Sequence, residues 1–224
     1  ARGGDYPNLI EFAQRCYDYG ADGITIHPRP DQRHIRYTDV EALSKIFPKE
    51  HCEFNIEGYP SDEFIELVLN NKPTQVTLVP DPPHILTSNS GWNTVENFHF
   101  LAPIISEFQK YDIRVSLFMD TNIEFISKAK ELSADRIEFY TGDYFKEYPS
   151  NREQAIRPFI ESYQFALSIG IDVNAGHDLN LDNLAYFKAN LPELKEVSIG
   201  HWLISDCLYY GLENTIPMYK RLLK

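Results

Sequence analysis

The stretch EFNIEGYPSDEFIELVLNNKPTQVTLV, residues 53–79, holds two short strand patterns on either side of one helix pattern. Residues 53–57 and 75–79 are rich in the β-branched and aromatic residues that favour strands. Between them, residues 61–69 have the apolar spacing of an amphipathic helix. A helix that connects two strands in this way is typical of parallel strands joined by a crossover. The segment therefore predicts a parallel α/β fold.

The same alternation runs through the rest of the chain. Further strand patterns are residues 23–27, 113–118, 136–140, 171–174 and 196–200, and further helix patterns include residues 9–19, 122–132 and 154–169. Seven strands after an opening helix are one fewer than a closed (β/α)8 barrel contains. An open doubly wound sheet usually has a glycine-rich phosphate loop after its first strand, and the sequence has none. We therefore predict a single (β/α)8 TIM-barrel domain over residues 1–224, amino-terminally incomplete because its first strand lies upstream of Ala1.

Composition limits the partners and the compartment. The chain has 33 acidic and 21 basic residues, a net charge of −12 that argues against binding to nucleic acid or to an anionic membrane surface. It contains neither a signal-peptide pattern nor an apolar run as long as the roughly 18 residues of a membrane-spanning helix. Its three cysteines, Cys16, Cys52 and Cys207, are odd in number and far apart. We therefore expect buried free thiols and a reducing, cytoplasmic setting.

Every predicted strand ends in a polar group. In chain order these are His27, Glu57, Asp81, Asp120, Glu138, Asn174 with His177, and Gly200 with His201. Each one alone could be a helix cap or a solvated loop residue. Because the carboxyl ends of barrel strands meet on one rim, which is where barrel enzymes have their active sites, the full set predicts an active site there.

Two strand-end carboxyls are candidate acid–base groups. Glu57 precedes Gly58 in FNIEG, and Glu138 has the same placement in RIEFYTG. Partial burial there would raise the pKa of Glu57 and let it act as a base near neutral pH. The alternative is that Glu57 pairs with Arg29 or Arg33 for structural reasons.

Two segments have the features of anion sites. In SIGHWLIS, residues 198–205, Gly200 is followed by a helix start whose backbone N–H groups can bind phosphate. In ITIHPRPDQRHI, residues 24–35, the group Arg29, Arg33 and His34 would form a second cluster on the opposite side of the mouth. Ala175 and Gly176, before His177, would let the backbone approach a ligand closely. Two anion sites predict two phosphorylated substrates or one bisphosphate, unless the glycines are plain turns and the basic loop is only solvated.

Two absences narrow the chemistry. No predicted strand has a lysine at its carboxyl end, so we expect no Schiff base between enzyme and substrate. No His-x-His or His-x-x-x-His spacing indicates zinc, and we predict no metal, although a site built from His27, Glu57, His177 and His201 stays geometrically open.

Several motifs together resemble the pyridoxine 5′-phosphate synthase family over nearly the whole chain. They are GADGITIHPRPDQRHI, FNIEGYPSDEF, VTLVPD with LTSNSGW, IEFYTG, NAGHDLN and VSIGHWLISDCLYYGL. The resemblance implies a barrel enzyme that needs no cofactor and forms homo-oligomers, octamers in the family. It also implies condensation of 3-amino-2-oxopropyl phosphate with 1-deoxy-D-xylulose 5-phosphate to pyridoxine 5′-phosphate, inorganic phosphate and water.

The resemblance also implies roles for residues by position. His27 and Glu57 match proton acceptors, His177 matches a proton donor, and Glu138 matches a group that stabilises the transition state. Arg29, His34 and Thr87 match contacts to the deoxyxylulose phosphate, and Arg2, Gly200 and His201 match contacts to the amino ketone phosphate. Asp178 matches a substrate-binding position whose backbone contacts an anion. Many members have Gly at the position of Asp178, and the substrate contacts of the family's first strand are not in this sequence. Two alternatives are a metal-dependent sugar-phosphate isomerase or epimerase on the same barrel and a non-catalytic phosphate-ligand binding protein.

Overall fold

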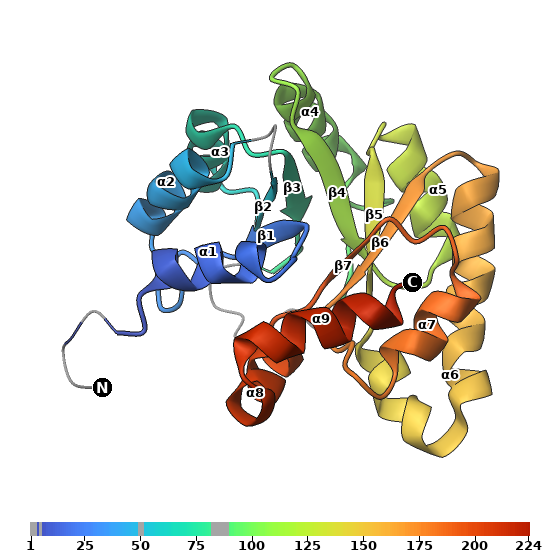
Figure 1. The fold of residues 1–224 in the computed structure, drawn as a ribbon. Helices are drawn as coiled ribbons and strands as arrows, with labels where there is room; N and C mark the ends of the chain where they lie inside the picture. Colours follow the sequence, from blue (N-terminus) through green and yellow to red (C-terminus); the bar gives the residue numbers. More distant parts are fainter. Residues whose placement is uncertain (1–3, 5, 49–51, 82–89) are drawn as a thin grey trace.

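The computed structural model describes residue 4 and residues 6–48, 52–81 and 90–224. Within these residues seven strands form one parallel sheet in the order β1-β2-β3-β4-β5-β6-β7. Their bounds are β1 (Gly23–Ile26), β2 (Glu53–Gly58), β3 (Gln75–Leu78), β4 (Arg114–Met119), β5 (Arg136–Tyr140), β6 (Asp172–Gly176) and β7 (Glu196–Ser198). The sheet curves into a nearly closed barrel with β1 and β7 as its two edges (Figure 1). The predicted TIM-barrel fold is confirmed, and each predicted strand agrees with the structure to within two residues.

Helices alternate with the strands and surround the sheet (Figure 1). They are α1 (Leu9–Asp18), α2 (Tyr37–Ile46), α3 (Asp62–Asn71), α4 (Phe98–Gln109), α5 (Ile123–Glu131), α6 (Gly142–Ser168), α7 (Leu184–Asn190), α8 (His201–Tyr210) and α9 (Leu212–Leu222). The helix predicted over residues 154–169 is the second part of α6, which has a kink at Asn151 (φ −154°, ψ 87°). Within the described ranges, none of the helices combines the length and the hydropathy that a membrane-spanning helix requires.

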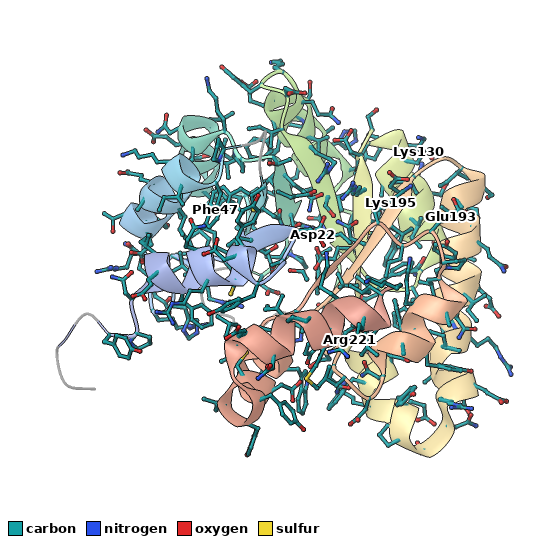
Figure 2. The ribbon with its side chains drawn as sticks, in the orientation of Figure 1. Asp22, Phe47, Lys130, Glu193, Lys195 and Arg221 are labelled. Carbon is teal, nitrogen blue, oxygen red and sulfur yellow. The ribbon has the colours of Figure 1, made fainter. Side chains whose placement is uncertain are left out.

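Side chains alternate along each strand between the barrel interior and the helices, because successive residues of a strand point to opposite faces. The outward row is apolar and fully buried, as at Ile56, Val76, Leu117 and Val173. It packs in a continuous core between the sheet and the helices, where Figure 2 shows the space filled with side chains. The inward row is largely polar, so charged groups in the strands face the middle of the barrel.

Ion pairs join the first residues of several strands at the amino-terminal end of the barrel. Arg136 of β5 lies 3.0 Å from Glu196 of β7, and Arg114 of β4 pairs with Glu53 of β2. These contacts join strands that are not neighbours in the sheet, so they cross the barrel interior. Pairing offsets the desolvation cost of placing these charges inside the protein.

The cysteines are free thiols, as the sequence predicted, and none forms a disulfide. Cys16 and Cys52 are buried, whereas Cys207 is only partly buried, so the prediction of three buried thiols is wrong at Cys207. Cys207 lies on α8, a helix without a single buried residue.

Candidate active site

His27 and Glu57 form the central contact at the carboxyl end of the sheet. Ile26 of β1 is paired in register with Ile56 of β2, so the next residue of each chain segment, His27 and Glu57, comes side by side. His27 Nδ1 lies 3.3 Å from Glu57 Oε1. Both side chains are largely shielded, with 22% and 17% of their surface exposed. Glu57 therefore pairs with a histidine, and the contact offers a route for protons between the two groups.

The pKa of Glu57 is lowered, which contradicts the expectation of a raised value. Burial alone would raise this pKa, but the electrostatic interaction and the hydrogen bond with His27, followed by the smaller effects of His177 and Arg29, together outweigh burial. Glu57 is therefore an ionised carboxylate, ready to accept a proton. The sequence could not show this balance, because His177 lies 120 residues further along the chain and approaches only through the fold.

The raised carboxyl pKa belongs to Glu138 instead. Its side chain is 2% exposed, and burial, followed by the charges of Glu57 and Glu196, moves its pKa well above the ordinary value. Thr77 Oγ1 donates a hydrogen bond to Glu138 Oε2 over 3.4 Å and so fixes the carboxyl group. Glu138 is therefore held as a neutral acid, which can donate a hydrogen bond.

Polar residues of the inward row, which the sequence analysis did not single out, support Glu138. Asn55 of β2 donates a hydrogen bond to Thr77 of β3 over 3.1 Å and lies 3.3 Å from Thr25 of β1. The signal for this network was present in the alternate polar positions of EFNIE and QVTLV. It could not be interpreted before the fold showed which face of each strand lines the interior.

Gly176 serves a different purpose from the one expected. The sequence indicated close approach of the backbone to a ligand, but a Cβ atom here would meet Glu138 Oε1 instead. The glycine thus makes room for the buried carboxyl of β5. Ala175, which precedes it, is fully buried in the outer core.

His177 follows β6 in a backbone conformation that is rare for residues other than glycine, with φ +87°. Its Nδ1 lies 2.8 Å from Asp178 Oδ2, and its ring stacks edge-on against Tyr140 at 5.4 Å between centroids. The hydrogen bond to Asp178 is the main cause that raises the pKa of His177, with smaller contributions from Glu57 and Asp81. His177 is thereby favoured as an imidazolium, and its side chain is placed to donate a proton.

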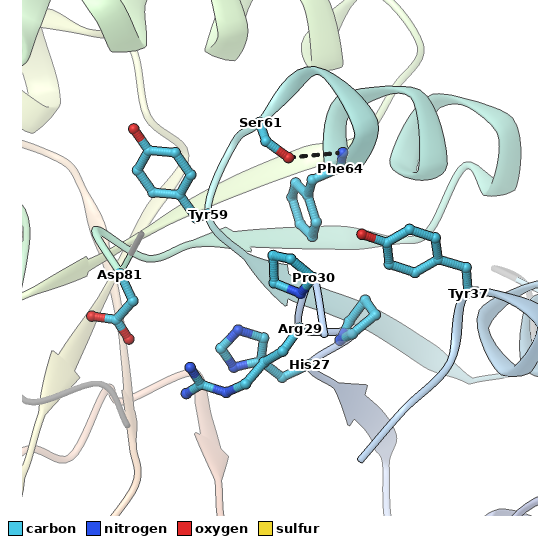
Figure 3. Close-up of a pocket in the computed structure, with 9 residues that line it drawn as sticks. His27, Arg29, Pro30, Tyr37, Tyr59, Ser61, Phe64 and Asp81 are labelled. Atoms are coloured by element: carbon cyan, nitrogen blue, oxygen red, sulfur yellow. Dashed lines mark hydrogen bonds between the residues drawn. The ribbon is translucent and has the colours of Figure 1, made fainter. Parts of the chain in front are cut away.

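In the structure, the residues of the predicted basic cluster, Arg29, Arg33 and His34, have different surroundings. Arg29 and His27 line a pocket together with Asp81 and Tyr59 (Figure 3). Arg33 instead forms an ion pair with Asp31 within its own loop, at 2.9 Å. His34 is exposed near the same loop.

The second predicted anion site lies at the start of α8. Gly200 and His201 are both exposed, and among the described residues no atom beyond the adjoining ones lies within 4 Å of the position that a Cβ of Gly200 would take. The first backbone N–H groups of any helix have no partner within the helix, so this end can accept an anion. The sequence placed the two anion clusters opposite each other. In the structure they follow the two edge strands of the sheet, β1 and β7.

Arg2 and Thr87 lie outside the described residues. Asp120 accepts a hydrogen bond from the backbone N–H of Gly91 over 3.0 Å and so fixes the segment that leads into α4. In the described part of the chain, no group of three or more His, Cys, Asp or Glu side chains is arranged to hold a metal ion. The set His27, Glu57, His177 and His201 is therefore not such a group.

The chain is also similar, in sequence and in fold, to known proteins. The family model of the pyridoxal phosphate biosynthesis protein PdxJ matches residues 1–224. A protein of Parabacteroides distasonis named pyridoxine 5′-phosphate synthase is 55% identical over 220 residues, which are 98% of this chain and 91% of the relative. A protein of Bacteroides thetaiotaomicron with the same name is 54% identical over 224 residues, all of this chain and 93% of the relative. The crystal structure of phosphoribosyl anthranilate isomerase from Thermotoga maritima is similar with a TM-score of 0.60 at 13% identity, over 96% of this chain and 93% of that one, which shows a shared fold alone.

Proposed function

The chain belongs to the family of the pyridoxal phosphate biosynthesis protein PdxJ, and from this membership we propose that it acts as a pyridoxine 5′-phosphate synthase. In the proposed reaction, 3-amino-2-oxopropyl phosphate and 1-deoxy-D-xylulose 5-phosphate condense to pyridoxine 5′-phosphate, inorganic phosphate and water. One observation carries the chemical part of the proposal. Glu57 and Glu138 share one barrel interior, yet their pKa values are moved in opposite directions. Two carboxyls set apart in this way can act as base and acid at the same pH.

The first bond forms when the amine of the amino ketone attacks the carbonyl carbon of the deoxyxylulose phosphate. Loss of water then gives an imine, with the nitrogen supplied by the substrate and not by a lysine of the enzyme. Attack requires a proton to leave the amine, and later dehydrations require protons to leave carbon. Glu57 is ionised and contacts His27, so this pair is the candidate for accepting those protons. Positioned acid–base groups typically contribute about 10²–10⁴-fold each.

The other two groups supply protons or hydrogen bonds. A neutral Glu138 can donate a hydrogen bond to an oxygen that gains negative charge in the transition state. A protonated His177 can give its proton to a departing hydroxyl group, which then leaves as water. The substrate pair thus meets a base and two donors at one end of the barrel.

Two phosphate sites are assigned within the proposal. Arg29 presents a rigid guanidinium fork suited to phosphate oxygens, and with His34 it would bind the deoxyxylulose phosphate. Gly200 and His201 at the start of α8 would bind the phosphate of the amino ketone. Contacts from Arg2 and Thr87, and assembly into a homo-oligomer, remain predictions.

Turnover of the two substrates tests the proposal. The purified full-length protein should form pyridoxine 5′-phosphate and release inorganic phosphate only when both substrates are present. Liquid chromatography of the product and a phosphate assay would follow the reaction, with the Parabacteroides distasonis relative as a positive control. If that relative turns over and this protein does not under the same conditions, the proposed function is wrong.

A further inference from the structure

We propose that Asp178 is a positioning residue that holds the His177 imidazole in place and in its protonated form, so that His177 can donate a proton; this inference rests on the proposed function. The observation behind it is the hydrogen bond of 2.8 Å between His177 Nδ1 and Asp178 Oδ2. The resemblance to the family had assigned Asp178 to contacts with a substrate phosphate. The geometry points to a different task for the same residue.

The backbone of Asp178 is held from both sides. Its N–H donates to Thr141 Oγ1 over 3.1 Å, and the Thr141 hydroxyl donates in turn to the carbonyl oxygen of Gly176 over 2.7 Å. Its carbonyl oxygen accepts a hydrogen bond of 3.3 Å from Asn183 Nδ2. A phosphate that used the N–H of Asp178 would have to displace Thr141, and the carboxylate would repel that phosphate. The contacts therefore favour support of His177 over binding of an anion.

The His177 ring is restrained on two sides. Its backbone has φ +87°, and its N–H donates to the carbonyl oxygen of Ser198 over 3.1 Å. Strained conformations of this kind persist where the surrounding structure fixes them and are common at functional sites. Asp178 binds one edge of the ring, and the Tyr140 ring packs edge-on against it. The imidazole thus has little freedom to turn away from the mouth of the barrel.

The charges around His177 favour the imidazolium. Asp178 lies in the same loop, Glu57 comes from β2 and Asp81 follows β3, and all three raise the pKa of His177 against the effect of burial. Tyr140 of β5 packs against the ring, and Trp202 and His201 of α8 both lower the pKa of the Asp178 carboxyl. Burial raises the pKa of Asp178, but the interactions with His177, Trp202 and His201 together outweigh burial and lower this pKa, so Asp178 is the anionic partner.

This arrangement gives the two ring nitrogens of His177 different roles. Asp178 accepts the hydrogen of Nδ1, so the second ring nitrogen, Nε2, is the one that would exchange a proton with a ligand. When Nε2–H gives its proton to a departing hydroxyl, the C–O bond breaks and water leaves with that electron pair, while the neighbouring carbon loses a proton to the base and the C–H electron pair forms the new double bond. His177 is then neutral. A proton from solvent then restores the imidazolium. Asp178 keeps the donor charged before the step and oriented during it.

Carboxylate-to-amide substitution tests the inference. Asp178→Asn preserves shape and removes the charge, Asp178→Glu preserves the charge, and Asp172→Asn makes the same chemical change at the other end of β6. Asp172 lies 3.6 Å from Lys195, which is labelled in Figure 2, and this pair is away from His177. In each protein, the His177 titration is followed by NMR with ring-labelled histidine, its signal being the one absent in His177→Asn. The profile of kcat against pH is measured in parallel.

In Asp178→Asn the titration midpoint of His177 should fall, and the alkaline limb of the kcat profile should move to lower pH. Turnover should drop about 10- to 100-fold at pH 8 and less at pH 6, short of the ~10²–10⁴-fold expected for losing a general acid. Asp178→Glu should keep more of the wild-type titration midpoint and turnover than Asp178→Asn does. Asp172→Asn should match the wild type in both measurements.

An unchanged His177 midpoint in a folded Asp178→Asn protein would overturn the inference. So would a raised KM for the amino ketone phosphate with unchanged kcat, which would make Asp178 a binding residue. If Asp178→Asn fails to fold, the NMR spectrum of the wild type still tests the inference. The signal of the Nδ1 proton that is hydrogen-bonded to Asp178 must then appear far downfield and be coupled to the His177 ring. A wild-type protein that does not convert the two substrates would refute the proposed function. The NMR titration would still test whether Asp178 holds His177 in its protonated form.

Discussion

A Cβ atom at Gly176 would lie 2.1 Å from Oε1 of Glu138, so the carboxyl group of β5 occupies space that any other residue would need on β6. Glu138 and Gly176 lie on neighbouring strands of the sheet. The buried acid of the candidate site therefore depends on the absence of a single side chain from the adjacent strand.

Gly176→Ala should displace the Glu138 carboxyl. Overpacking of this kind typically lowers the free energy of unfolding by about 1–3 kcal/mol, and turnover should fall with it. Urea denaturation and kcat would measure the two effects. Gly4→Ala is the matched control, since no atom of the described residues lies within 4 Å of its Cβ position. Wild-type stability and turnover in Gly176→Ala would show that the close approach is unimportant.

Glu57→Gln should fold normally and lose about 10²–10⁴-fold in turnover, because an amide cannot accept the proton. In the wild type the lowered pKa of Glu57 keeps the base ionised above its folded pKa, and activity should fall as pH drops through that value. Steady-state kinetics at several pH values and thermal melting would measure both. A variant with unchanged melting temperature and near-wild-type turnover would contradict the role of Glu57 as a base.

Glu138→Gln should change how stability depends on pH. The raised pKa of Glu138 means that the folded state holds a proton that the unfolded state releases. The corresponding stability is full below the unfolded pKa of about 4.3 and is lost as pH rises through the folded pKa. A glutamine cannot ionise, so the variant should lose less stability than the wild type between pH 5 and pH 8. Urea denaturation across this range measures the difference, with exposed Glu41→Gln as control; parallel curves for Glu138→Gln and the wild type would refute a neutral Glu138.

Arg29→Ala should raise the KM for 1-deoxy-D-xylulose 5-phosphate more than the KM for the amino ketone phosphate. Arg29→Lys should restore binding only in part, because an ammonium group lacks the planar fork that contacts two phosphate oxygens. Arg33→Ala is the internal comparison, and its effect should be milder because Arg33 pairs with Asp31. Kinetics with each substrate varied separately would measure these values. Equal weakening for both substrates would mean that Arg29 does not distinguish between the two phosphates.

The order of the elements could be predicted from the chain because it depends on local patterns. The stretch of residues 53–79 specified a strand, a helix and a strand, and β2, α3 and β3 lie there. Strand periodicity and helix periodicity are written into consecutive residues, and parallel strands joined by helices leave few possible topologies. By the same logic, the sequence predicts that His27, Glu57, Glu138 and His177 lie at one end of the sheet.

Protonation could not be predicted in the same way. The sequence pointed to Glu57 as the carboxyl with a raised pKa, but the raised value belongs to Glu138. A pKa is the balance between burial and every nearby charge, and these charges come from strands far apart in the chain.

The sequence by itself therefore determined the barrel, the rim and the kinds of residue placed on it. Only the tertiary structure decided that His27 contacts Glu57, that Gly176 makes room for Glu138 and that Asp178 binds His177 through its carboxylate. The physical reason is range. Secondary structure follows from neighbours a few residues apart, whereas the charge and orientation of a catalytic group follow from contacts that form only when the strands close around a common interior.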